Sequence, residues 1–255
     1  MKTLTFIAIS LLSGVIAGTV LALVNQGVVL PFIERAIAIE NQRAEAKGEI
    51  LDPAAMDAYR LWQREGSIAS GALLGLSYGA LLGVVFAYSR KGLPGKNSAV
   101  KAMLLAGIVW SVIYLAVALK YPANPPAVGN PDTIYLRMTL YVAMLMISGM
   151  SALGAALLYR KMGERQKYGA ARWPVALAVY VSIVIVAFFA LPPNPDAVNA
   201  PLDLVNGFRV ASASTMGMFW VLLGAILGLL WDKTKPHEDT PAKALDKYTG
   251  QSDTP

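Results

Sequence analysis

Six long stretches of the chain carry no charged residue, and they constrain the fold more than any other feature. They cover residues 3–33, 66–89, 102–119, 138–159, 173–195 and 210–231. Each is at least 18 residues long, and a helix needs roughly 20 predominantly apolar residues to cross a bilayer. With 56% hydrophobic and 15% charged residues, the chain is predicted to be an all-α, polytopic membrane protein. A soluble globular protein, a disordered chain and a nucleic-acid-binding domain are excluded, so the net charge of +6 does not indicate nucleic acid.

The stretches predict six transmembrane helices, arranged as three helical hairpins within one membrane domain, residues 1–231. The expected spans are about 5–33, 66–89, 102–119, 136–159, 173–191 and 209–231. The first is interpreted as a retained helix, because its apolar region is too long for a secretory signal and no clean cleavage site ends it. The polar residues 232–255 are expected to form a disordered cytoplasmic tail.

Basic residues are unevenly divided between the two ends of the predicted spans. The segments before span 1 and after spans 2, 4 and 6 hold 14 of the 22 Lys and Arg residues. Short loops rich in Lys and Arg stay in the cytoplasm, so both termini are predicted to be cytoplasmic and the protein to lie in the plasma membrane. Aromatic residues at the span ends fit the same orientation, with Trp173 and Trp231 inside and Tyr121 and Tyr135 outside.

One long loop, residues 34–65, is expected on the outer side between the first two spans. Asp52 and Pro53 within it are typical of a helix start, with Asp as the N-cap and Pro in the first turn. Tyr59 and Trp62, three residues apart, are expected on one helix face at the membrane interface. The loop is otherwise interpreted as a solvated connector.

Two shorter outer loops resemble each other. Residues 121–137 read YPANPPAVGNPDTIYLR and residues 191–209 read LPPNPDAVNAPLDLVNGFR. Asn124 aligns with Asn194, each is followed by Pro, and each loop ends in an Arg before an inward span. Spans 3–4 and 5–6 are therefore interpreted as duplicated hairpins of the same orientation. Asn-Pro turns are also common between unrelated helices, which is the alternative.

Small residues recur at helical spacing in three of the predicted spans. In span 2 they form a stripe of Gly71, Gly75, Gly79 and Gly83. Gly14 and Gly18 in span 1, and Gly224 and Gly228 in span 6, repeat the motif once each. Such stripes let a neighbouring backbone approach closely, which favours packing inside the bundle. A homodimer face, and with it an oligomer, is the alternative.

Enzyme motifs are not found in the chain. There is no Cys, and the one His, His237, lies in the polar tail. HExxH, P-loop and GxGxxG motifs are absent, so neither an enzyme nor a bound cofactor is predicted. Two Met-x-Met pairs, Met144/Met146 and Met216/Met218, would suit a soft ion such as Cu(I). Residues two apart on a helix point in different directions, so these methionines are interpreted as bundle core.

The remaining site candidates are polar residues near the outer ends of the spans. No acidic or basic residue is expected deep within a span, where it would mark an ion path. Carboxylates, amides and loop carbonyls suit a hard or borderline divalent cation. The candidate metal ligands are Glu34, Asp132, Asp196 and Asp203. The candidates for lining a pore or its mouth are Asn25, Gln26, Asn124, Asn194, Arg137 and Arg209.

Several of these candidates have structural alternatives. Asp132 and Asp203 could instead cap the helices that follow them. Arg137 and Arg209 begin inward helices at the outer face, against the positive-inside bias and the helix dipole. They would either pair with the loop acids or share a site for a solute.

Three segments together resemble the CbtA family, polytopic proteins that form the larger subunit of a cobalt transporter. They are GVIAGTVLALVNQGVVLPFIE in the first span, REGSIASGALLGLSYGALLGVVFA in the second, and the Pro-rich outer loops. The resemblance covers most of residues 5–231. It implies cobalt uptake linked to cobalamin supply, with a small partner subunit similar to CbtB that carries a His-rich terminus.

The leading hypothesis is therefore an integral membrane subunit of a divalent-cation uptake system, with Co²⁺ as its cargo. No ATP-binding motif is present, so energy would come from a gradient or from another subunit. The alternative is a non-transporting accessory or structural subunit of a larger membrane complex, since no span contains a charge.

Overall fold

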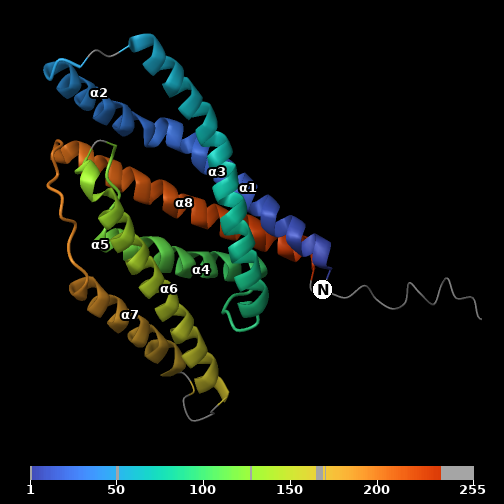
Figure 1. The fold of residues 1–255 in the computed structure, drawn as a ribbon. Helices are drawn as coiled ribbons and strands as arrows, with labels where there is room; N and C mark the ends of the chain where they lie inside the picture. Colours follow the sequence, from blue (N-terminus) through green and yellow to red (C-terminus); the bar gives the residue numbers. More distant parts are fainter. Residues whose placement is uncertain (1, 50–51, 127, 165–168, 170, 237–255) are drawn as a thin grey trace, which may run out of the picture.

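A computed structural model describes the chain except for residues 1, 50–51, 127, 165–168, 170 and 237–255. The described residues form helices joined by turns and loops, with no strand among them (Figure 1). The elements are α1 (Thr3–Val28), α2 (Leu30–Ala46), α3 (Pro53–Ser89), α4 (Ser98–Trp110), the π-helical turn η1 (Ser111–Leu115), α5 (Ala116–Lys120), the 3₁₀ turn η2 (Pro131–Thr133), α6 (Ile134–Glu164), α7 (Arg172–Ala190) and α8 (Leu202–Thr234). Six helical stretches among them are long and apolar enough to cross a membrane. The predicted all-α membrane protein with six transmembrane helices is thereby confirmed.

The predicted first span, residues 5–33, is divided between two helices. α1 ends at Val28 and α2 begins at Leu30. The reason is Pro31, which has no N–H and whose ring clashes with the carbonyl four residues earlier in a continuous helix. The first membrane helix is therefore shorter at this end than the charge-free stretch.

The predicted connector, residues 34–65, is largely helical. α2 fills its first part, and α3 begins at Pro53. The Asp52 side chain accepts hydrogen bonds from the backbone N–H groups of Ala54 and Ala55 at 3.0 and 3.3 Å. This N-cap confirms the predicted helix start.

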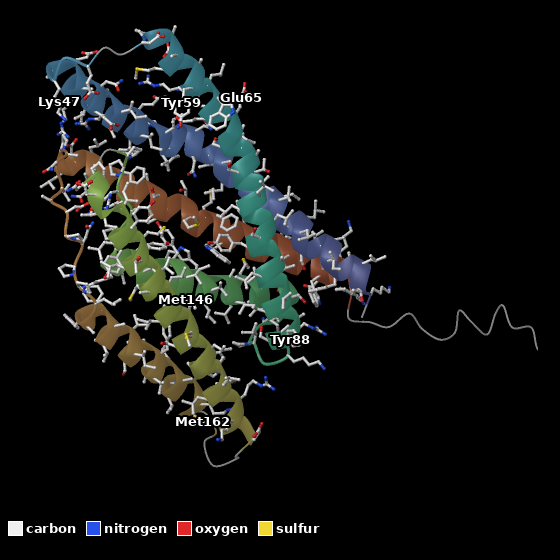
Figure 2. All side chains as sticks on the ribbon, in the orientation of Figure 1. Lys47, Tyr59, Glu65, Tyr88, Met146 and Met162 are labelled. Carbon is white, nitrogen blue, oxygen red and sulfur yellow. The ribbon has the colours of Figure 1, made fainter. Side chains whose placement is uncertain are left out.

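The first half of α3 extends beyond the apolar part of that helix. Figure 2 shows Tyr59 and Glu65 on this half of α3, at the same end of the molecule as Lys47 at the end of α2. The Tyr59 and Trp62 rings stack with centroids 5.8 Å apart and stay 58% and 67% exposed. An ion pair between Arg64 of α3 and Glu34 of α2 joins the two helices.

α1 and α3 cross at a contact formed by glycines, where the two backbones touch directly. A Cβ on Gly75 would overlap the carbonyl oxygen of Gly14, and a Cβ on Gly79 would come within 2.8 Å of Gly14 Cα. Gly18 and Gly71 approach each other in the same way one turn further along. The structure therefore places the glycine stripe against α1, where small residues allow the closest approach of two helices.

α8 lies at the centre of the bundle and packs against α1 and α4. Its Trp220 and Trp231 are almost fully buried, in a cluster that includes Phe86 of α3. A Cβ on Gly224 would lie 2.8 Å from the Cα of Met103 in α4, so a glycine is what allows this helix pair to close. The main core of the molecule is thus built around α8, the last helix among the described residues.

The arrangement in three hairpins is not confirmed. α1 packs against α3 as the prediction required, but α8 packs against α1 and α4, and α7 packs against α6. Figure 1 shows α6 and α7 side by side, with α8 on the other side of α6. The physical reason is that Gly224 and Gly228 give α8 a surface that fits α4. The link of residues 191–201 has no regular structure and lets α8 lie apart from α7.

A π-helical turn, η1, interrupts the third span and contacts α6. Its Val112 carbonyl accepts a 2.6 Å hydrogen bond from Ser148 Oγ of α6, and Ser148 Oγ lies 3.0 Å from Tyr180 Oη of α7. A π turn shifts the regular backbone hydrogen bonds, and an unpaired carbonyl in a bilayer is costly. The Ser148 hydroxyl supplies a hydrogen-bond partner for this carbonyl and joins the α6–α7 pair to the third span.

The start of α1 and the end of α8 lie at the same end of the molecule (Figure 1). The backbone N–H of Lys2 donates to the carbonyl of Pro236 at 2.8 Å. We call the opposite end, which carries residues 121–130 and 191–201, the distal end.

Candidate functional site

Two Pro-rich loops meet at the distal end. Loop 1 (residues 121–130) leads from α5 to η2, and loop 2 (residues 191–201) leads from α7 to α8. The Tyr121 hydroxyl donates to the carbonyl of Pro192 at 2.7 Å, which ties the loops together near their starts. The two loops that resemble each other in sequence are therefore also neighbours in space.

Asp196 of loop 2 is held by residues at the start of the fourth span. Its carboxylate accepts from the Asn130 N–H at 2.9 Å and from Thr133 Oγ1 at 2.8 Å, and Arg137 Nε lies 3.1 Å from Oδ2. The Asp196 side chain is only 6% exposed. Partial desolvation raises the pKa of Asp196, but the hydrogen bonds from Thr133 and Asn130 and the charge of Arg137 outweigh it and lower the pKa below its ordinary value. Asp196 is therefore ionised at neutral pH.

The tripeptide Asn-Pro-Asp occurs once in each Pro-rich region. In both copies the Asn Oδ1 accepts a bond from the N–H of the Asp, at 3.0 Å between Asn130 and Asp132 and at 3.1 Å between Asn194 and Asp196. Such side-chain turns are typical of Asn. The sequence alignment matched Asn194 with Asn124, whereas the local geometry matches it with Asn130. The repeated tripeptide is the signal that could have indicated this.

Arg209 of α8 holds loop 1. Its Nη2 donates to Asn124 Oδ1 at 2.7 Å, and its Nε donates to the Ala123 carbonyl at 3.3 Å. The ion pairs of the described residues include no acidic partner for Arg209. Of the two arginines, Arg137 thus pairs with a loop acid and Arg209 binds only neutral oxygens.

Gly129 leaves the space that the Asp196–Arg137 pair occupies. Its φ is +114°, a backbone conformation that side chains disfavour. A Cβ at this position would also lie 2.6 Å from both Arg137 Nη1 and Asp196 Oδ2. A glycine is required here for two independent reasons.

A pocket of about 350 Å³ opens beside loop 1, loop 2 and α6. The polar side chains that line it belong to Tyr121, Asn124, Arg137, Tyr141 and Asn194. Prolines and aliphatic side chains form the remainder, and the lining residues that the structure describes include no carboxylate. The volume is suited to a small molecule. This distal pocket is the candidate functional site, and three of the predicted mouth residues line it, namely Asn124, Arg137 and Asn194.

The four candidate metal ligands do not gather in one place. Three of them form ion pairs with arginines, namely Glu34 with Arg64, Asp196 with Arg137, and Asp203 with Arg35. Asp132 is exposed, and the side chain of Asn130 rather than that of Asp132 caps η2. Among the described residues, no three His, Cys, Asp or Glu side chains are grouped so that they could hold a metal ion.

Two further mouth candidates lie away from the pocket. Gln26 Nε2 donates to Ser67 Oγ at 2.7 Å, which joins α1 to α3. Asn25 Oδ1 is buried and has no hydrogen-bond partner within the described part of the chain. Neither residue lines the distal pocket.

The methionine pair in α6 divides between interior and surface. Met144 is fully buried, whereas Met146, which Figure 2 labels on α6, is 56% exposed. The two sulfur atoms therefore belong to different environments, as the spacing of two residues on a helix requires. His237 lies outside the described residues.

Comparison with protein-family models identifies a match. No curated protein and no solved structure among those compared matches the chain. The family model described as "Probable cobalt transporter subunit (CbtA)" matches residues 3–232, from the start of α1 almost to the end of α8. The match includes all six membrane helices and both distal loops. The chain therefore belongs to the CbtA family of probable cobalt transporter subunits.

Proposed function

We propose that this protein is the membrane-embedded subunit of a cobalt uptake system in the plasma membrane, with both termini in the cytoplasm. The observation that carries the proposal is the family match over residues 3–232, which spans the complete six-helix bundle. The role is transport, and Co²⁺ is its cargo rather than a resident cofactor.

The charge distribution supports the proposed orientation. The start of α1 and the end of α8 lie together at one end of the molecule. The segments predicted to lie on the same side of the membrane as these two helix ends hold 14 of the 22 basic residues. Loops rich in Lys and Arg stay in the cytoplasm, so the distal end faces outward. The distal pocket then lies where a solute outside the cell would first meet the protein.

The composition of the bundle supports a partner subunit. The described residues hold no group of three His, Cys, Asp or Glu that could coordinate a metal ion, and cobalt in proteins takes imidazole and carboxylate ligands. We propose that a small His-rich membrane subunit similar to CbtB supplies ligands that this chain lacks. In this arrangement the present chain forms the membrane-spanning part and the partner supplies the metal ligands, which fits the family description of a subunit.

Uptake of radioactive cobalt tests the proposal. Cells that lack both genes would receive this chain alone, the partner alone, or both, and cobalt accumulation would be followed at low external metal. We expect accumulation only with both chains, and competition by nickel stronger than by magnesium, because nickel shares the preferences of cobalt for nitrogen ligands. Equal accumulation with and without this chain, together with a stable complex of the two, would instead indicate a non-transporting accessory subunit.

A further inference from the structure

The distal pocket presents hydrogen-bond donors. Asn124 Oδ1 is occupied by Arg209 Nη2, and Asn194 Oδ1 is occupied by the Asp196 N–H. Because both donors require an oxygen acceptor, the orientation of each amide is fixed. The NH₂ groups of Asn124 and Asn194 have no acceptor among the hydrogen bonds of the described residues, and an amide NH₂ can only donate.

The net charge beside the pocket is positive, so it favours a negatively charged ligand, as the amide donors do. The guanidinium of Arg137 lines the pocket, and that of Arg209 is bonded to a pocket asparagine. Among the ion pairs of the described residues, the carboxylate that pairs with either arginine is that of Asp196, with Arg137. Arg209 has no acidic partner among the described residues, so one positive charge remains at the pocket.

A hydrated divalent cation does not match this lining. The described lining residues include no carboxylate that would attract a divalent cation, and the Arg137 guanidinium in the lining and the Arg209 guanidinium bonded to Asn124 would repel it. An anion with several carboxylate oxygens matches it, because carboxylates only accept and pair with guanidinium and amide N–H groups. A pocket of about 350 Å³ has room for such a molecule.

We infer that the distal pocket binds a small polycarboxylate, either free or as the ligand shell of a metal complex. The second form rests on the proposed function, because it makes the captured species a cobalt chelate and not the bare ion. The donors of Asn124 and Asn194 and the guanidinium of Arg137 would hold the outer oxygens of the ligand.

Two isosteric substitutions test the pocket. Asn124→Asp and Asn194→Asp keep the oxygen that Arg209 and the Asp196 N–H require, but each replaces an NH₂ donor with a negatively charged acceptor. Asn199→Asp is the matched control, since it adds the same charge to loop 2 and its residue does not line the pocket. Thermal unfolding of all three purified proteins would show that they are folded.

Isothermal titration calorimetry on the full-length protein would use citrate, the cobalt–citrate complex, and cobalt chloride in a non-coordinating buffer. We expect saturable binding of citrate or of its cobalt complex to the wild type and the control. Each pocket variant should bind about ten-fold more weakly or worse, because a charged hydrogen bond is replaced by repulsion. Binding of the complex but not of free citrate would identify the chelate as the ligand, and equal binding would identify a general carboxylate site.

Three results would overturn the inference. The first is that neither citrate nor its cobalt complex binds saturably at millimolar concentration. The second is that the wild type and all variants bind citrate equally well. The third is that cobalt chloride alone binds and that the pocket variants bind it more tightly. The uptake assay separates this inference from the proposed function. Cobalt uptake without carboxylate binding leaves the function standing and removes the pocket ligand. Carboxylate binding without cobalt uptake leaves the pocket ligand standing and removes the transport role.

Discussion

Asp196 joins the two distal loops through a single carboxylate. The sequence placed Asp196 and Arg137 among the candidates because both are charged residues beside apolar spans. It could not indicate Thr133 or the Asn130 N–H as their partners. These bonds exist only once two loops about 65 residues apart interlock, and a hydroxyl or a backbone N–H carries no pattern of its own.

We expect Asp196→Asn to lower the melting temperature at neutral pH, because Arg137 loses its charged partner. The pKa of Asp196 is lowered in the folded protein. Its contribution to stability is therefore fully present above the ordinary Asp pKa of about 3.9 and is lost as the pH falls through the folded-state value. Melting curves recorded from neutral to acidic pH should converge for the wild type and the variant.

The control for this measurement is Asp132→Asn, which removes an exposed acid from the adjacent turn. A loss as large as that of Asp196→Asn would show that the total charge of the distal end matters and not the specific pair.

At the level of helices, the contact of α1 with α3 depends on backbone meeting backbone. The sequence showed the glycine stripe clearly, since four small residues at a spacing of four have few other uses in a membrane helix. It did not show that α8 pairs with α4 and α1 or that α7 pairs with α6. An apolar helix face is as stable against lipid as against another apolar helix, so the choice of partner helix depends on how well two surfaces fit. The order of residues in the sequence does not show that fit.

Gly75→Ala should destabilise the protein although alanine favours helices. The added Cβ overlaps the Gly14 carbonyl oxygen, and overpacking costs on the order of 1–3 kcal/mol. Gly149→Ala in α6 is the matched control, because a Cβ there meets nothing within 4 Å. A fluorescence-monitored thermal shift in mild detergent would compare the two, and equal melting temperatures would show that the α1–α3 contact does not limit stability.

For the whole molecule, the bilayer made the class of fold predictable. Every spanning segment must be long, apolar and internally hydrogen-bonded, so charge-free stretches predicted the six spans. The same stretches misplaced the end of the first helix, since Pro31 rather than a charge ends it. They also presented residues 34–65 as a connector, although α2 and the first half of α3 fill most of it, because these helices carry charged residues along their length and so contain no charge-free stretch.

The proposed orientation makes a prediction about sidedness. A reporter fused after Asp232 should be active in the cytoplasm, and one inserted near Gly48, between α2 and α3, should be active outside. The reason is the excess of basic residues on the side of the termini. Paired fusions of alkaline phosphatase and a fluorescent protein would measure this, and the same side for both positions would refute an odd number of crossings between them.

The central place of α8 has a consequence for biosynthesis. Of the six spanning helices it is the last to leave the ribosome, yet its Trp220 and Trp231 fill the space among the earlier ones. Until it is inserted, the faces of the first three spans that pack against α8 lack their protein partner, because contacts between distant parts of a chain form late. Insertion of α8 and closure of the main core are therefore the same event.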